Sequence, residues 1–270
     1  MNRVKPYFDK ITLIDRIKQI KPEKVLLIFL HGLGDYMMFR AIFKKLQQTF
    51  ADIKFQVGCL EVVQLHRVFP EIIPLLNDDP YQNPQMFEYD LVVDIEFPMC
   101  EYLEEKITKS ELCCQMEIGF SSVSEHLTLP EYPNKLACVH FQCTALPGQG
   151  ATEYEAKMIW EDIVSAGWCP LEIQFEHYFH NPLNSKFDFV DSSVRNCKPD
   201  LAVLFGLIQK SGIFIGGTSG PFHVALSCLP PERVVYLERD FPKDRYTYLP
   251  IKTVKLNSYN HEIKKWLNML

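Results

Sequence analysis

Short apolar runs recur along this chain, and a segment with helical periodicity follows most of them. Lys24–Leu30, Tyr89–Ile95 and Lys135–Gln142 are such runs. A run that is apolar at nearly every position predicts a strand buried on both faces. Strands that alternate with helices predict parallel sheets with right-handed crossovers. The pattern therefore predicts an α/β fold.

The amphipathic segments support this interpretation. Phe39, Ile42, Phe43 and Leu46 recur at helical spacing behind Asp35, so we expect a helix there with this face buried. The next strand is expected at Phe55–Leu60 and the next helix at Glu61–Phe69. Further helices are expected over residues 101–118 and over residues 153–167, the latter ending at Gly167.

The sequence divides into two similar halves. A stretch rich in Ser, Pro and turn residues, 121–134, separates them, and the strand–helix pattern then starts again. We place the boundary at residue 130, which gives domains of residues 1–130 and 131–270.

Composition excludes several classes of protein. The formal net charge is −6, without a basic run, so we expect no nucleic-acid partner. The Lys44-Lys45 pair is interpreted as a solvated helix face. The 9 Cys form no CxxC pair and are expected to be reduced. The longest apolar run, Val25–Leu30, is too short to span a bilayer, and no signal segment is apparent. We therefore expect a cytoplasmic protein without a transmembrane segment.

Each half carries one glycine turn between a strand and a helix. Such turns lie at the carboxyl edge of a parallel sheet, where a helix start offers N–H donors to a phosphate. The first turn contains Gly32 and Gly34 and ends in Asp35, whose carboxylate suits a helix cap or a base. The second turn has only neutral or titratable groups and suits a diphosphate. Its candidate residues are Gly217, Thr218, Ser219, Gly220 and His223.

These segments resemble glycosyltransferase family 9, the ADP-heptose:lipopolysaccharide heptosyltransferase type. Residues 32–57 (GLGDYMMFRAIFKKLQQTFADIKFQV) are similar to that family's opening Gly-Asp turn, first helix and second strand. Residues 199–238 are similar to its donor site, in which a D-[ST]-G-x-x-H turn follows a strand. KSELCCQMEIGF, residues 109–120, is similar to the segment that closes the family's N-terminal domain.

The resemblance implies a GT-B-like fold, with two Rossmann-like domains whose parallel sheets face each other across a cleft. Residues 1–130 would bind the acceptor, and residues 131–270 the sugar nucleotide. Asp35 would be the general base, and the groups around Ser219, Gly220 and His223 would hold the diphosphate. The implied reaction is inverting transfer of a sugar, such as a heptose, from an ADP-linked donor to a hydroxyl of a glycan, glycolipid or protein. No D-x-D triplet occurs, so no metal or other cofactor is expected, and activity should survive a chelator.

The chain departs from the family pattern at two places. Thr218 stands where the family has an acid, and the loop of residues 143–151 has no Lys or Arg, leaving Thr144 as the nearest polar candidate. Two alternatives therefore stay open. One is a degenerate transferase that only binds a nucleotide or a partner. The other is an α/β-hydrolase, with GFSSV (Gly119–Val123) as an incomplete nucleophile elbow.

Overall fold

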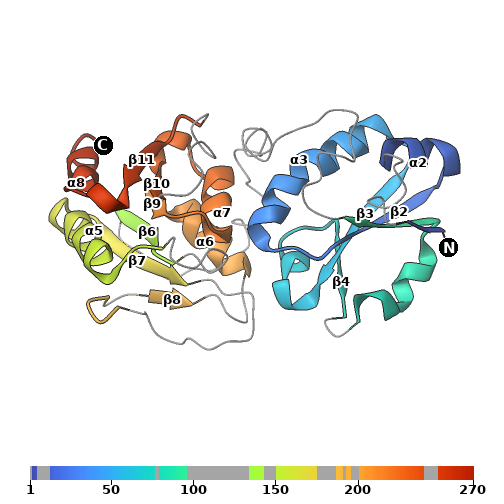
Figure 1. The fold of residues 1–270 in the computed structure, drawn as a ribbon, viewed down its shortest axis with the longest axis horizontal. Coiled ribbons are helices and arrows are strands. Elements are labelled where there is room, and N and C mark those ends of the chain that lie inside the picture. Colours follow the sequence, from blue (N-terminus) through green and yellow to red (C-terminus); the bar gives the residue numbers. More distant parts are fainter. Residues whose placement is uncertain are drawn as a thin grey trace. The chain divides into compact units, whose positions relative to one another are not determined.

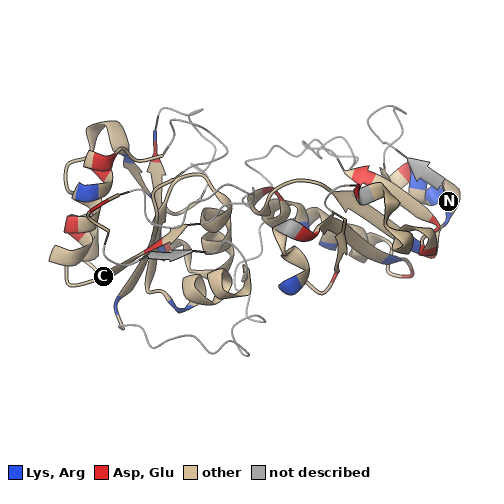
Figure 2. Ribbon diagram, turned by 90° about the horizontal axis from the view of Figure 1, so that it is seen from below, with Lys and Arg blue, Asp and Glu red and all other residues tan. Residues whose placement is uncertain are grey.

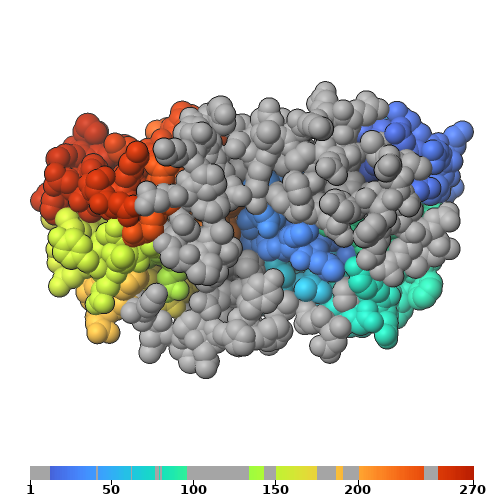
Figure 3. Space-filling view, in the orientation of Figure 1, coloured from blue at the N-terminus to red at the C-terminus, as the bar shows by residue number. Residues whose placement is uncertain are grey.

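The structure is a computed structural model of the 270-residue chain. It describes residues 2–4, 13–76, 79–95, 134–142, 150–174, 187–190, 193–195, 201–239 and 249–270, and the others are grey in Figures 1 and 3. The chain divides into two compact units, residues 1–116 and 117–270. The boundary expected at residue 130 lies outside the described residues.

The N-terminal unit is a parallel sheet with the strand order β1-β5-β2-β3-β4. Its elements are β1 (Asn2–Val4), α2 (Leu13–Ile20), β2 (Lys24–Phe29), α3 (Leu33–Thr49), β3 (Lys54–Leu60), the 3₁₀ helices η1 (Glu61–Val63) and η2 (Leu65–Arg67), β4 (Ile72–Leu75), the 3₁₀ helices η3 (Pro80–Gln82) and η4 (Pro84–Glu88), and β5 (Leu91–Ile95). Strands β2 and β5 are central, which explains why their sequences are apolar almost throughout.

Helix α3 packs its predicted apolar face on the sheet. Phe39, Ile42, Phe43 and Leu46 are all buried, and the Phe39 ring stacks on Phe29 of β2 at 5.0 Å between centroids. The helix expected over Glu61–Phe69 was a wrong prediction. Two short 3₁₀ helices stand there instead, because Gln64 between them has a left-handed backbone with φ of 58°.

The C-terminal unit is a second parallel sheet, with the strand order β11-β10-β9-β6-β7-β8. Its elements are β6 (Leu136–His140), α5 (Glu153–Ser165), β7 (Cys169–Gln174), β8 (Ser193–Arg195), α6 (Leu201–Lys210), β9 (Ile213–Gly216), α7 (Gly220–Cys228), the 3₁₀ helix η7 (Pro231–Arg233), β10 (Val234–Glu238), β11 (Lys252–Lys255), the 3₁₀ helix η8 (Leu256–Ser258) and α8 (Glu262–Leu267). The α/β fold with two parallel sheets is therefore confirmed.

Helices cover both faces of this second sheet. Figure 1 shows α5 and α8 on one side of the strands and α6 and α7 on the other. Side chains of α5 and α8 form one continuous surface at their end of the unit (Figure 3). Helix α5 ends as predicted: Gly167 has φ of 78°, and Trp168 N–H donates to Ile163 O at 3.1 Å, which completes a Schellman turn.

Three further expectations can be compared with the described residues. Cys59, Cys138, Cys169 and Cys228, which lie in the described residues, form no disulfide there. None of the helices in the described ranges is long and apolar enough to cross a membrane. Figure 2 shows basic and acidic positions interspersed over the ribbons of both units. The helix expected over residues 101–118 lies outside the described residues.

Candidate functional site

Each sheet has one point where the strand order reverses. In the C-terminal sheet, β6 leads through α5 to β7 on one side, whereas β9 leads through α7 to β10 on the other. In the N-terminal sheet the reversal lies between β2 and β5. Ligands of open α/β sheets bind beyond the carboxyl ends of the two strands at such a point. Both predicted glycine turns therefore lie where this rule places a ligand.

The second turn connects β9 to α7 through Gly217, Thr218 and Ser219. Ser219 is the N-cap of α7, and its hydroxyl accepts a hydrogen bond from the Phe222 N–H at 3.3 Å. The Thr218 hydroxyl lies 3.2 Å from the hydroxyl of Tyr236 on β10. The turn is thus held by a cap on one side and by the neighbouring strand on the other.

The His223 side chain contacts this turn. Its Nδ1 lies 2.7 Å from the carbonyl oxygen of Ser219, and because a carbonyl only accepts, Nδ1 carries the proton and donates. The side chain is 3% exposed. Nδ1 is therefore committed to the turn itself, and Nε2 is the ring atom that could contact a ligand.

Gly216, the last residue of β9, has a steric role. A Cβ at this position would lie 2.8 Å from the Phe214 ring and 3.1 Å from the carbonyl oxygen of His140. At Gly217 the nearest atom would be Leu237 O at 3.6 Å, an ordinary contact. Close packing of the strand end therefore requires glycine at position 216, whereas sterics alone do not require it at position 217.

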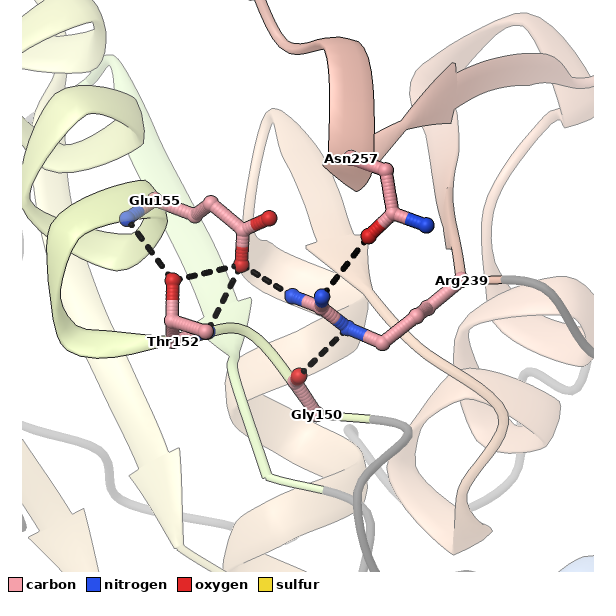
Figure 4. Close-up of polar contacts among 5 residues, drawn as sticks. All are labelled: Gly150, Thr152, Glu155, Arg239 and Asn257. Carbon is pink, nitrogen blue, oxygen red and sulfur yellow. Dashed lines mark hydrogen bonds and ion pairs between the residues drawn. The ribbon is translucent and has the colours of Figure 1, made fainter.

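The start of α5 lies at the same reversal point, but side chains of the protein already satisfy the partial positive charge of this helix start (Figure 4). Thr152 and Glu155 form a capping box, in which the Glu155 carboxylate accepts from the Thr152 N–H at 2.8 Å. Arg239, which follows β10, pairs with the same carboxylate. It also donates to Gly150 O at 3.2 Å and to the Asn257 side chain at 2.8 Å.

This arrangement distinguishes the two helix starts. The N–H groups and dipole at the α5 start are already met by the carboxylate of Glu155, which also pairs with Arg239, so this helix start is occupied by the protein's own anion. The start of α7, from Gly217 to His223, has no acidic side chain. An anion bound at this reversal point is therefore favoured at α7.

His140 is a site residue that the sequence analysis missed. It ends β6 opposite Gly216, and its Nδ1 lies 2.6 Å from Ile173 O. Burial lowers the pKa of His140 to about 4, so the ring is neutral near pH 7. The only sequence signal was a polar residue at the end of an apolar strand, and such residues are common.

The first turn places Asp35 inside α3 rather than in front of it. The helix begins at Leu33 with Gly32 as its N-cap, so Gly34 and Asp35 lie in its first turn. The expected capping position of Asp35 is thus corrected, because the N-cap is Gly32, three residues earlier. All three of these residues are half-buried. A carboxylate in the first turn is stabilised by the helix dipole and remains close to the sheet edge.

A second carboxylate lies at the same edge and was also missed. Asp94 is the fourth residue of β5, pairs in register with Ile28 of β2 and is 6% exposed. A strand that is apolar on both sides of this residue gives no signal for it. Thr144, the remaining predicted site residue, lies outside the described residues. Within the described ranges, no three potential metal ligands lie together.

No protein-family model matches the chain, and no curated protein matches its sequence. Solved structures do match. The chain is similar to the iron-containing dodecameric glycosyltransferase TibC of enterotoxigenic E. coli, with a TM-score of 0.61 and 12% identity over 86% of this chain. It spans 62% of the length of TibC.

Two further structures match over nearly their whole length. The ADP-heptose lipopolysaccharide heptosyltransferase II of E. coli has a TM-score of 0.60 and 13% identity, over 91% of this chain and 98% of its own. A family 9 glycosyltransferase of Veillonella parvula has a TM-score of 0.54 and 12% identity, over 92% and 93%. This likeness disfavours the hydrolase alternative, whose Gly119–Val123 motif lies outside the described residues. The chain therefore has the GT-B-like fold of the family 9 glycosyltransferases.

Proposed function

We propose that this chain is a glycosyltransferase that moves a sugar from a nucleoside-diphosphate donor to a hydroxyl acceptor. The observation that carries the proposal is the contrast between the two helix starts of the C-terminal sheet. The start of α5 holds its own carboxylate, Glu155, whereas the start of α7 has only neutral groups and His223. A diphosphate placed at the strand reversal would therefore bind at α7.

The leaving group would be stabilised mainly by dipoles. Backbone N–H groups at Ser219 and Gly220 and the Thr218 hydroxyl are the candidate donors, and Nε2 of His223 joins them only in the imidazolium form, in which both ring nitrogens carry a proton. Pro221 contributes no N–H, and the Phe222 N–H is used by the cap. No Lys or Arg lies between Gly217 and His223. Stabilisation by oriented dipoles suits a site from which water is excluded.

The base would come from the N-terminal unit. Asp35 would take the proton from the acceptor hydroxyl while that oxygen attacks the anomeric carbon, and the nucleoside diphosphate would leave from the opposite side. This displacement inverts the anomeric configuration. The proposal requires Asp35 and the α7 start to act on one bound pair of substrates.

The donor is proposed to be ADP-linked, and the reaction to need no metal. TibC has been solved with ADP-D-β-D-heptose and the heptosyltransferase WaaC with ADP. The absence of a D-x-D triplet supports a reaction without a bound divalent ion. The 9 Cys without a CxxC pair, a pattern typical of reduced cysteines, support the proposal of a cytoplasmic location. If EDTA abolishes turnover and a divalent ion restores it, the proposal that the reaction needs no metal is refuted.

The test combines binding with turnover. Melting temperatures are measured with ADP, UDP, GDP and CDP and with sugar nucleotides, and we expect the largest rise with ADP compounds. Asp35→Asn should then lower turnover by about two to four orders of magnitude, the usual effect of losing a general base, while the ADP-induced rise remains. Asp52→Asn, at an exposed position just beyond α3, is the matched control.

Nucleotide binding without transfer is the second candidate. Thr218 favours it, because it stands where the family pattern has an acid. A rise in melting temperature with ADP, together with no donor turnover in the wild-type protein for any acceptor, would select this candidate. If no nucleotide raises the melting temperature, both candidate functions are rejected.

A further inference from the structure

A diphosphate at the start of α7 would find no cation in the turn itself. No Lys or Arg lies between Gly217 and His223, and the loop of residues 143–151 has none either. Glu238, the last residue of β10, is half-buried and shares its strand face with Tyr236, so it adds a negative charge near this turn. A cation from elsewhere in the C-terminal unit would therefore strengthen the binding of a diphosphate.

Arg239 extends across the carboxyl end of β9. It follows β10 directly, and its Nε donates to Gly150 O at 3.2 Å. The next residue, Ala151, is tied to the end of β6, because its N–H donates to Phe141 O at 2.9 Å. Strand β9 lies between β10 and β6 in the sheet. The Arg239 side chain therefore crosses over the end of β9, the strand that leads into the α7 turn.

The guanidinium of Arg239 is oriented by the protein (Figure 4). Besides Gly150 O, it contacts the Asn257 side chain at 2.8 Å and the Glu155 carboxylate. A guanidinium has five N–H bonds, and in the part of the chain that the structure describes only three of them have a partner. The Arg239 side chain is 17% exposed. It therefore keeps donors for an acceptor that approaches from solvent.

The charge of Arg239 is compensated by Glu155, and this pairing has a consequence for a ligand. A phosphate oxygen that accepts directly from the guanidinium lies closer to it than to the carboxylate, so the attraction exceeds the repulsion. Glu155 nevertheless weakens the binding of the phosphate while it keeps the guanidinium in position. Removing the charge of Glu155 should therefore tighten the binding of an anion at Arg239.

We propose that Arg239 binds one phosphate of a nucleoside diphosphate whose other phosphate lies at the start of α7. Two anion-binding groups on two sides of one strand end suit a ligand with two phosphates. This inference rests on the proposed function, which places the diphosphate at α7, and it names the part of the donor that the site recognises. Arg239 would also stabilise the nucleoside diphosphate as it leaves.

The test is calorimetric titration of the full chain with ADP, AMP and adenosine. Arg239→Met should weaken ADP binding about tenfold, the effect of losing one charge-assisted hydrogen bond. The binding of AMP, whose single phosphate lies at α7, and of adenosine should change less than about twofold. Arg233→Met is the matched control. Arg233 also donates to a backbone carbonyl, Gly212 O at 3.0 Å, but Gly212 precedes β9 at the opposite end of that strand.

Two variants of Glu155 separate ligand binding from stability. Glu155→Gln retains a side chain that suits the capping box but removes the charge, so ADP should bind about threefold more tightly. The double variant Arg239→Met, Glu155→Gln should recover part of the stability that Arg239→Met loses, yet bind ADP as weakly as Arg239→Met. A purely structural role of Arg239 predicts instead that ADP binding recovers together with stability. Melting temperatures without nucleotide show that each variant is folded.

Three results would overturn the inference while the proposed function stands. They are ADP binding by Arg239→Met that equals that of the wild type or of Arg233→Met, recovery of ADP binding in the double variant, and a loss of AMP or adenosine affinity as large as that of ADP. If the wild-type chain binds none of the three compounds, the proposed function is itself rejected, and the role of Arg239 with it.

Discussion

His140 should make the stability of the C-terminal unit depend on pH. Its ring is buried at the end of β6, and Nδ1–H donates to Ile173 O. The variant His140→Asn keeps a donor at the position of Nδ1, because the Asn amide nitrogen overlaps it, but removes the titratable ring. The difference between wild type and variant therefore reports the protonation of the His140 ring.

The expected magnitude follows from the pKa. Burial lowers the pKa of His140 from an ordinary 6.5 to about 4. Between these values the unfolded chain binds one proton more than the native unit, so the free energy of unfolding falls as the pH falls. The slope is up to about 1.4 kcal/mol per pH unit, which gives a loss of about 2 kcal/mol by pH 5 and about 3 kcal/mol by pH 4. This contribution is fully present only above about pH 6.5.

Tryptophan fluorescence is the suitable assay. The chain has 3 Trp, at positions 160, 168 and 266, and all of them lie in the C-terminal unit. Urea unfolding followed by fluorescence thus reports the unit that contains His140. The variant loses some stability at every pH because its side chain is smaller, typically about 1–3 kcal/mol. Between pH 8 and pH 5, however, its curve should fall about 2 kcal/mol less than that of the wild type.

Parallel pH profiles would refute this reasoning. If wild type and His140→Asn lose the same free energy of unfolding between pH 8 and pH 5, within about 0.5 kcal/mol, then His140 does not stay neutral in the folded unit.

Three further predictions concern the same unit, and fluorescence-monitored urea unfolding checks each. Arg239→Met should lower the free energy of unfolding by about 1–3 kcal/mol, because the Glu155 side chain, 11% exposed, loses its cation. Adding Glu155→Gln should restore part of this free energy, and no restoration would argue against the ion pair. Gly167→Ala should lower the free energy of unfolding by about 1 kcal/mol, because φ at this position is 78°. An unchanged urea midpoint would be inconsistent with the Schellman turn. Ser219→Ala should lower the free energy of unfolding by about 1 kcal/mol and weaken ADP binding, whereas Ser219→Thr should retain most of the stability and of the binding. If the two variants behave alike, Ser219 does not act as the cap.

Most of the fold could be predicted from local patterns. The buried strands β2, β5 and β6 and the helices α3, α5 and α7 are each visible in their own sequence, because burial on two faces or on one helix face leaves a periodic signal. Strands at or near the sheet edges, such as β4 and β8, were missed because they span four and three residues. The false helix at residues 61–69 failed at Gln64, whose left-handed backbone no periodicity reveals.

The amino-acid sequence determined the α/β class, the two glycine turns and the helix starts behind them, since all of these depend on residues close together in the chain. Tertiary structure alone brought Arg239 to the start of α5. Glu155 and Arg239 are 84 residues apart and meet only because the sheet places the end of β10 beside the start of α5. The same holds for Lys44 and Lys45, which are equal in sequence. They differ in the structure because a helix turns about 100° between neighbours, which leaves Lys44 half-buried and Lys45 exposed.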